Sequence, residues 1–262
     1  MSEILKLTDL TLNFGGLTAV ANVDLTLETG ELVGLIGPNG AGKTSIFNLL
    51  TGVYAPSDGT IEFRRDDTTR QLGGMKPHAI CRAGLGRTFQ NIRLFRALPV
   101  IDNVMVAVQQ NLTYGLVASF LHTPGQRKTE QAIRERSMEL LRIMHLDDKA
   151  NELAANLSYG EQRRLEIARA MATEPVLLLL DEPAAGMNPA ETAQLTELIA
   201  SLRRDFDLTI LLIEHDMSLV MKICERIYVL DHGLVIATGS PAEVQANPKV
   251  IEAYLGEEAD NV

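Results

Sequence analysis

A glycine-rich segment, GPNGAGKT, runs from Gly37 to Thr44 between an apolar stretch and a predicted helix. It matches the pattern GxxxxGK[ST] in the strand-to-helix context that the pattern requires. Its glycines let successive backbone N–H groups converge on phosphate oxygens, Lys43 can reach the outer phosphates, and the Thr44 hydroxyl can hold Mg²⁺. We therefore expect a nucleotide site rather than a glycine-rich turn without a ligand. Its contact residues would be Gly37, Pro38, Asn39, Gly40, Ala41, Gly42, Lys43, Thr44 and Ser45.

Two adjacent carboxylates follow a second apolar stretch. The segment VLLLLDEP, residues 176–183, predicts a buried strand that ends in Asp181 and Glu182. The carboxyl edge of a parallel sheet would present both side chains beside the phosphate loop. Asp181 is then a candidate Mg²⁺ partner through water, and Glu182 can orient and deprotonate an attacking water. The alternative is a solvated strand end that caps the next segment.

Four further polar positions have ordinary structural explanations when each is taken alone. Ser158 and Glu161 in LSYGEQ suit a helix cap and a first helical turn. Gln90, in GLGRTFQNIRLF, could be an exposed loop amide. A single histidine after a strand, such as His215, is more often structural than catalytic. None of these positions identifies a function by itself.

Taken in order, GPNGAGKT, Gln90, LSYGEQRR, VLLLLDEP and His215 resemble the motifs of the ATP-binding cassette (ABC) ATPases. The resemblance extends from Ile4 to about Gly256. It implies an α/β fold of the P-loop NTPase (RecA-like) type, with a mostly parallel sheet core, an N-terminal antiparallel β subdomain and an inserted α-helical subdomain. It also implies a composite site, in which ATP lies between the phosphate loop of one cassette and the LSYGEQ segment of a second.

The resemblance assigns roles to residues that spacing alone leaves open. Ser158, the Gly160 backbone and Glu161 would face the γ-phosphate across the interface, although Glu161 replaces the family's usual Gln. Gln90 would reach Mg²⁺ and the attacking water, and its segment would join the ATP site to a groove for a helix of a membrane subunit. His215 resembles the switch histidine that contacts the γ-phosphate.

The remaining assignments are weaker matches to the family pattern. Phe14 lies where an aromatic residue usually stacks on adenine, with Val20 nearby, although Phe14 could equally fill a core. Tyr159 replaces a glycine of the commonest signature sequence and needs room at the interface. In AAGMNP, Ala185 replaces Ser and Asn188 replaces Asp, so a charge-based role of this loop is in doubt.

The elements that must position these residues can be read from apolar spacing. Alternation over residues 4–12 and 23–27 predicts antiparallel strands, and helical spacing over residues 98–156 predicts a helical insertion. Fully apolar strands that alternate with helices predict a mostly parallel sheet covered on both faces. The other expected elements are strands at 31–36, 60–63, 176–180 and 208–213, helices at 44–50, 160–172 and 190–204, and a hairpin at 226–237.

We expect one ABC ATPase domain over residues 1–262. Within it, residues 1–96 and 163–240 would form the nucleotide-binding core with the β subdomain. Residues 97–162 would form the helical subdomain with the signature motif, and residues 241–262 a C-terminal extension.

Composition limits the function classes. The chain has 262 residues with 46% hydrophobic and 22% charged residues, a balance typical of a folded globular protein. Its net charge of -10 disfavours nucleic-acid partners. Two cysteines without metal-ligand spacing indicate a reducing cytosolic compartment and no structural metal cluster. The longest apolar run, residues 176–180, is far below the roughly 20 residues that span a bilayer, so membrane association would require a partner.

A narrower resemblance concerns GRTFQNIRLF, LSYGEQRRLEIARA and DEPAAGMNP, which look most like ATPase subunits of importers for branched-chain amino acids. It implies ATP and Mg²⁺ as cofactors and membrane permease subunits as partners. It also implies a second ATPase subunit, identical or related, and indirectly a substrate-binding protein. The chain would lie peripherally on the cytoplasmic face of the inner membrane.

Three alternatives stay open at this point. One is a soluble ABC ATPase switch in DNA repair or translation, which usually carries two cassettes or a long coiled-coil insertion. A second is the ATPase of an importer for another solute, such as an amide or urea. A third is a regulatory module that binds nucleotide without hydrolysis; the retained Glu182 and His215 argue against it.

Overall fold

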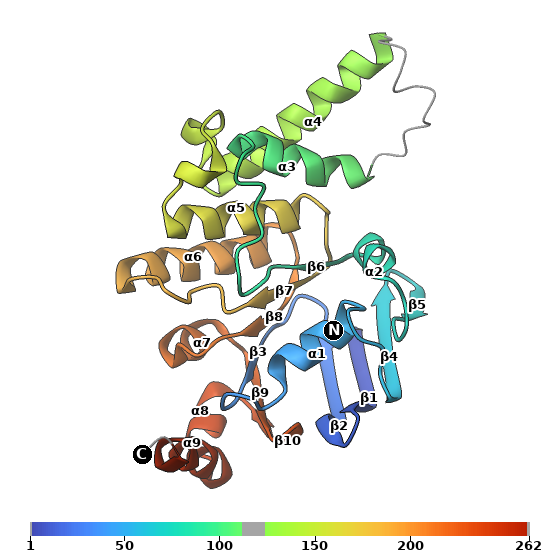
Figure 1. The fold of residues 1–262 in the computed structure, drawn as a ribbon, viewed down its shortest axis with the longest axis vertical. Helices are drawn as coiled ribbons and strands as arrows, with labels where there is room; N and C mark the ends of the chain where they lie inside the picture. Colours follow the sequence, from blue (N-terminus) through green and yellow to red (C-terminus); the bar gives the residue numbers. More distant parts are fainter. Residues whose placement is uncertain (1, 112–123, 261–262) are drawn as a thin grey trace. The chain divides into compact units, whose positions relative to one another are not determined.

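The structure is a computed structural model that describes residues 2–111 and 124–260. The chain forms two compact units (Figure 1). We call Met1–Arg87 with Val176–Val262 the sheet unit, and Thr88–Pro175 the helical unit. The helical unit is wider than the predicted 97–162, because it includes the segment after the strand that ends at Arg87 and the whole helix that follows Ser158.

The first sheet of the sheet unit is antiparallel, with strand order β2-β1-β4-β5. Its strands are β1 (Glu3–Phe14), β2 (Leu17–Glu28), β4 (Asp58–Arg65) and β5 (Thr68–Gln71). Alternate apolar residues of β1, such as Leu5 and Leu7, are buried, as the sequence alternation predicts. Strand β5 was not predicted because all four of its side chains are exposed and leave no apolar pattern.

The second sheet has six strands in the order β10-β9-β3-β8-β7-β6. All neighbours are parallel except β9 and β10, which form the predicted hairpin. Every residue of β3, β7 and β8 is buried, which explains their continuous apolar sequences. The mostly parallel sheet is thus confirmed. Its strands are β3 (Leu32–Ile36), β6 (Leu85–Arg87), β7 (Leu177–Asp181), β8 (Thr209–Ile213), β9 (Arg226–Asp231) and β10 (Leu234–Gly239).

One hydrophobic core joins the two sheets. Buried side chains of β1, β2 and β4 meet those of β3, β7 and β8 around the first helix, where Phe47 has no exposed surface. This helix therefore has a fixed position between the sheets. The helices of the sheet unit are α1 (Lys43–Leu50), α2 (Pro77–Ala83), α6 (Pro189–Asp205), α7 (Met217–Ile223), α8 (Pro241–Gln245) and α9 (Pro248–Asp260).

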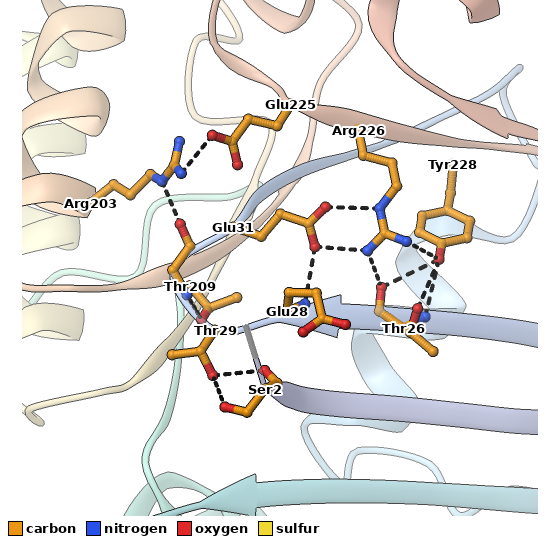
Figure 2. A network of polar contacts seen from close by, with 11 residues as sticks. Ser2, Thr26, Glu28, Thr29, Glu31, Arg203, Thr209, Glu225, Arg226 and Tyr228 are labelled. Atoms are coloured by element: carbon orange, nitrogen blue, oxygen red, sulfur yellow. Dashed lines mark hydrogen bonds and ion pairs between the residues drawn. The ribbon is translucent and has the colours of Figure 1, made fainter.

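A polar network ties the sheets together at the amino edge of the parallel sheet (Figure 2). The Arg226 guanidinium donates to both carboxylate oxygens of Glu31, at 2.8 and 2.7 Å, and to the Thr26 carbonyl at 2.8 Å. The Tyr228 hydroxyl accepts the Thr26 N–H at 3.1 Å. Because Glu31 precedes β3, the network lies at the opposite end of that strand from the glycine-rich loop.

The helical unit contains α3 (Val100–Val108), α4 (Pro124–Ile143) and α5 (Tyr159–Met171), with 3₁₀ turns at Gln109–Asn111, Asp147–Lys149 and Ala154–Asn156. Its core includes Val104, Leu140 and Leu165, all fully buried. The predicted helical insertion is therefore present, although its residues 112–123 lie outside the described part of the chain. Among the described residues, no helix is both long and apolar enough to cross a bilayer.

Candidate functional site

The carboxyl edge of the parallel sheet gathers most of the predicted site. Strands β3, β8, β7 and β6 are successive neighbours, and their parallel direction places their carboxyl ends at the same edge. The glycine-rich loop follows β3, His215 follows β8, and Asp181 with Glu182 ends β7. Parallel sheets bind ligands at this edge.

Two glycines of the loop occupy positions that no other residue could take without a backbone shift. Gly37 has φ +148°, and a Cβ there would lie 2.0 Å from the Leu230 carbonyl oxygen. Gly42 has φ +104°, and its Cβ would lie 2.6 Å from the Ala19 carbonyl oxygen. The glycines thus allow the loop to pass directly over the backbone of β9 and β2.

The turn between β9 and β10 is hydrogen-bonded to the glycine-rich loop. The Gly233 N–H donates to the Ala41 carbonyl at 3.0 Å, and the Ala21 N–H donates to the Gly233 carbonyl at 2.9 Å. These bonds connect the loop through the turn to β2. Segments that are far apart in the sequence therefore fix the loop's conformation.

Lys43 lies inside the loop rather than in solvent. Its ammonium donates to the carbonyls of Gly37 at 2.6 Å and Pro38 at 2.7 Å, and the residue is buried. A positive charge is thereby held within the curve of the loop. Of the other loop residues, Ala41 is buried, Gly42 and Ser45 are half-buried, and Asn39, Gly40 and Thr44 are exposed.

Glu182 and His215 come together from neighbouring strand ends. The His215 Nε2 lies 2.9 Å from the Glu182 Oε1, so one of the two atoms carries the bridging proton. Glu182 has φ +47°, a left-handed conformation that non-glycine residues rarely adopt and that tends to occur at functional sites. The arrangement holds a carboxylate in a fixed direction, which is what a general base needs.

Glu214 is a residue of this edge that the sequence analysis missed. Its buried carboxylate accepts the Ala184 N–H at 2.6 Å and the His215 N–H at 3.1 Å, and so connects the segments that follow β7 and β8. Burial raises the pKa of Glu214, and the nearby Glu182 charge adds to the rise. The only available signal was an acidic residue directly after the apolar run TILLI.

Arg87 is the second missed residue. Its guanidinium forms a buried ion pair with Asp181, at 2.9 Å between the nitrogen and Oδ2. It also donates to the Asn48 and Thr51 side chains, each at 2.9 Å. Arg87 therefore links the end of β7 to α1, the helix that begins in the glycine-rich loop. The short strand β6 gave no sequence signal for this contact.

Phe14 and Val20 have different environments. The Phe14 side chain is 44% exposed and meets the Tyr54 ring edge-on, with 5.1 Å between the ring centroids. Phe14 can therefore offer a face to an aromatic ligand. Val20 has no exposed surface and belongs to the hydrophobic core of the sheet unit. Its place near the adenine stays a prediction.

In the helical unit, Ser158 begins α5 with a capping box. Its exposed hydroxyl oxygen accepts the Glu161 N–H at 3.4 Å, and the Glu161 carboxylate accepts the Ser158 N–H at 2.9 Å. Lys149 donates to the other carboxylate oxygen at 2.6 Å. Burial alone would raise the pKa of Glu161, but the hydrogen bonds from Lys149 and Ser158 lower it. The half-buried Glu161 carboxylate is thus engaged by Lys149 and by the Ser158 N–H, and its contact with the nucleotide stays a prediction.

Gly160, Tyr159 and Gln90 also belong to the helical unit. Gly160 is half-buried, and Tyr159 is exposed, with its hydroxyl 3.4 Å from an Arg163 nitrogen. Gln90 has an exposed side chain, and its carbonyl accepts a hydrogen bond from Arg163. The structure therefore gathers the predicted residues into two groups, one in each compact unit.

Asn188, where the family pattern has Asp, begins α6. Its side-chain oxygen accepts the Ala190 and Glu191 N–H groups, both at 3.0 Å. An amide oxygen serves this capping role as a carboxylate would, although without the charge. The departure from the pattern thus leaves the local structure intact.

Two family models match the sequence. A model described as ABC transporter matches residues 20–185. A second, described as branched-chain amino acid ATP-binding cassette transporter, matches residues 235–260. The first range contains the glycine-rich loop, Gln90, Ser158, Asp181 and Glu182. The second contains all of β10 but its first residue, together with α8 and α9.

Individual proteins give a consistent result. The high-affinity branched-chain amino acid transport ATP-binding protein LivG of Salmonella typhimurium is 52% identical over 254 residues, which cover 97% of this chain and 98% of LivG. BraF of Pseudomonas aeruginosa, which has the same description, is 47% identical with the same coverage. A crystal structure of an ABC transporter's ATP-binding cassette in its ADP conformation has a TM-score of 0.83 at 27% identity, and covers 98% of this chain and 100% of that one.

Proposed function

Because this chain belongs to the ABC transporter family, we propose that it is the ATP-hydrolysing subunit of a membrane importer for branched-chain amino acids. The observation that carries the proposal is the carboxyl edge of the parallel sheet. There, a lysine-containing phosphate loop lies on the same edge as a carboxylate that is already oriented by a histidine.

The loop supplies the nucleotide site. The ammonium of Lys43 provides positive charge where the outer phosphates of ATP would bind, and the backbone N–H groups at the start of α1 add favourable dipoles. The exposed Phe14 ring can stack on adenine. We propose that this loop, including Gly37, Gly40 and Gly42, holds the triphosphate.

The same edge fits Mg²⁺. Thr44 offers an exposed hydroxyl and Asp181 a carboxylate, and this oxygen set suits an ion that keeps several waters and phosphate oxygens as ligands. When bound, Mg²⁺ would neutralise charge on the phosphates. Glu182 would accept the proton of the attacking water on its carboxylate, while His215 keeps that carboxylate oriented. Gln90 is proposed to contribute through its exposed amide.

A second cassette would complete the site. The Ser158 oxygen accepts the helix N–H through a lone pair, so its own O–H can still donate to a phosphate held by a partner cassette. Tyr159 and Gly160 leave this end of α5 accessible. We propose a dimer with an identical or related ATPase subunit, in which Ser158 faces the partner's nucleotide.

The proposed setting is the cytoplasmic face of the inner membrane. Permease subunits would contact residues 97–162 of the helical unit, and a substrate-binding protein would act indirectly. The alternatives are not favoured: a soluble DNA-repair or translation switch would not need a C-terminal segment that matches the branched-chain amino acid cassettes. The Glu182–His215 contact argues against a module without turnover.

The test is stimulation of ATP hydrolysis by the solute. The chain would be reconstituted with its permeases and binding protein in lipid vesicles, and ATP turnover measured with leucine, isoleucine, valine or urea outside. We expect stimulation by the branched-chain amino acids. Stimulation by urea and not by leucine would contradict the proposal that the solute is a branched-chain amino acid. The absence of ATP turnover under every condition would contradict the proposal that this chain hydrolyses ATP.

A further inference from the structure

The segment that contains Gln90 is held by side chains instead of by secondary structure. Residues 88–95 form neither helix nor strand. The guanidinium of Arg163, a buried residue of α5, donates to the Phe89 carbonyl and to the Gln90 carbonyl, both at 2.5 Å. One side chain therefore fixes the two peptide groups next to the Gln90 side chain.

Glu166 holds the same segment by its N–H groups. One carboxylate oxygen of Glu166 accepts the N–H groups of Phe89 and Arg93, at 3.4 and 3.3 Å. The other oxygen pairs with the Arg163 guanidinium at 3.0 Å. We call this arrangement the Arg163–Glu166 clamp. Both N–H groups and carbonyl groups of residues 89–93 are thus hydrogen-bonded to side chains of α5.

The clamp lies close to the start of that helix. Arg163 is five residues after Ser158, and it also approaches the ring of Tyr159, with 5.8 Å between the guanidinium carbon and the ring centroid. A capped α-helix moves as a rigid element over such a short distance. The clamp therefore connects the first turns of α5 to the backbone of Gln90.

Stability alone does not explain the clamp. A buried ion pair loses hydration, and well-packed apolar side chains of similar volume often stabilise a protein equally well or better. What apolar residues could not supply are two donors for the carbonyls of Phe89 and Gln90 and an acceptor for the N–H groups. We therefore interpret Arg163 and Glu166 as residues that hold the segment around Gln90 in place, and not as residues that fill the core.

We propose that Arg163 and Glu166 are positioning residues that couple the two nucleotide sites of a cassette pair. This inference rests on the proposed function, in which Ser158 contacts the nucleotide of the partner and Gln90 serves the cassette's own site. Through the clamp, capture of the partner's nucleotide by Ser158 determines where Gln90 lies.

The first test needs no nucleotide. Hydrogen exchange would be measured at the Phe89 and Arg93 amides in the full chain and in the double variant Arg163→Met/Glu166→Leu, which removes both charges of the ion pair together. We expect at least about tenfold faster exchange at these two amides and unchanged exchange in the rest of α5. The matched control is Arg164→Met, which removes a charge from the next position of α5, outside the clamp.

The second test separates positioning from folding by kinetics. We expect the double variant to keep its KM for ATP within about twofold and to lose about 10- to 100-fold in kcat, because Gln90 is bound but misplaced. Arg163→Lys should recover part of kcat, since an ammonium can still reach one carbonyl. Arg164→Met should match the original chain in both quantities.

The outcomes are distinct. Unchanged exchange at Phe89 and Arg93, or an unchanged kcat in the double variant, would overturn the coupling. Nucleotide binding that Lys43→Ala leaves unaffected would instead overturn the proposed function, because that measurement concerns only the phosphate loop. Faster exchange together with a fall in kcat at constant KM would support the clamp.

Discussion

At the scale of residues, Glu182 at the carboxyl edge combines a strained backbone with a side chain that is held in place. The left-handed conformation of Glu182 costs about 1 kcal/mol or more, and it persists because neighbouring contacts hold it. Its N–H donates to the Ile213 carbonyl at 2.9 Å, and its side chain contacts His215. Glu182 is therefore directed before any substrate arrives.

The variant Glu182→Gln should bind ATP and lose hydrolysis. An amide cannot accept the proton of the attacking water, so we expect a fall of about 10²- to 10⁴-fold in kcat. With hydrolysis blocked, an ATP-dependent dimer should accumulate and be visible by size-exclusion chromatography. Glu197→Gln, an exposed position on α6, is the matched control. Turnover of Glu182→Gln at the original rate would reject Glu182 as the base.

Glu214 should make stability depend on pH. Burial raises its pKa in the folded protein above the unfolded value, so folding takes up a proton. Its contribution to stability is then fully present below the unfolded pKa, near 4.5, and is lost as the pH rises through the raised folded value. We expect Glu214→Gln to flatten the pH dependence of the urea midpoint above pH 4.5. An identical slope in the variant and the original chain would contradict this assignment.

At the scale of elements, two helices begin in the same way but have different proposed tasks. Ser158 caps α5 and Ser240 caps α8, each in a capping box with the third helical residue. Loss of such a cap costs about 1 kcal/mol in either helix. A functional difference between the two positions therefore cannot come from capping.

The variants Ser158→Arg and Ser240→Arg can be compared directly, because both remove the same kind of helix cap. Both variants should bind ATP, because neither residue belongs to the phosphate loop. Only Ser158→Arg should prevent closure of the two cassettes, since its bulk would occupy the place of the partner's phosphate, and we expect at least about a 100-fold loss of ATPase rate. Equal rates in the two variants would remove Ser158 from the proposed interface.

Elements with a strong apolar pattern could be predicted, and weakly patterned ones could not. Strands β3, β7 and β8 are entirely buried, and their sequences are therefore continuous apolar runs. Strand β5 is entirely exposed, and β6 has only three residues, so neither has a recognisable pattern. The loop, Glu182 and His215 follow from order along the chain. The contacts of Glu214, of Arg87 and of the Arg163–Glu166 clamp with residues 89–93 depend on which segments meet after folding. The helical spacing of Arg163 and Glu166 can predict their ion pair, but no local spacing encodes those contacts.

At the scale of the whole molecule, strands from the first and last quarters of the sequence are tied together in the sheet unit. The network around Arg226 joins β9, near the end of the sequence, to Glu31 and Thr26 near its beginning. Arg226 is partly exposed, so solvent screens the ion pair and the hydrogen bonds carry most of its contribution.

Arg226→Met should lower the free energy of unfolding by about 1–3 kcal/mol, because Glu31 and the Thr26 carbonyl lose their shared donor. The comparison is Arg204→Met, whose ion pair with Asp205 is solvent-exposed and should change stability by less than about 0.5 kcal/mol. Urea unfolding followed by circular dichroism measures both. A smaller effect at Arg226 than at Arg204 would show that the network is dispensable.

The Gly233 turn under the phosphate loop has a consequence for biosynthesis. The loop itself leaves the ribosome early, but its Ala41 carbonyl is bound by a residue that is synthesised almost two hundred positions later. In a nascent chain, this hydrogen bond can form only after the hairpin of β9 and β10 has emerged from the ribosome.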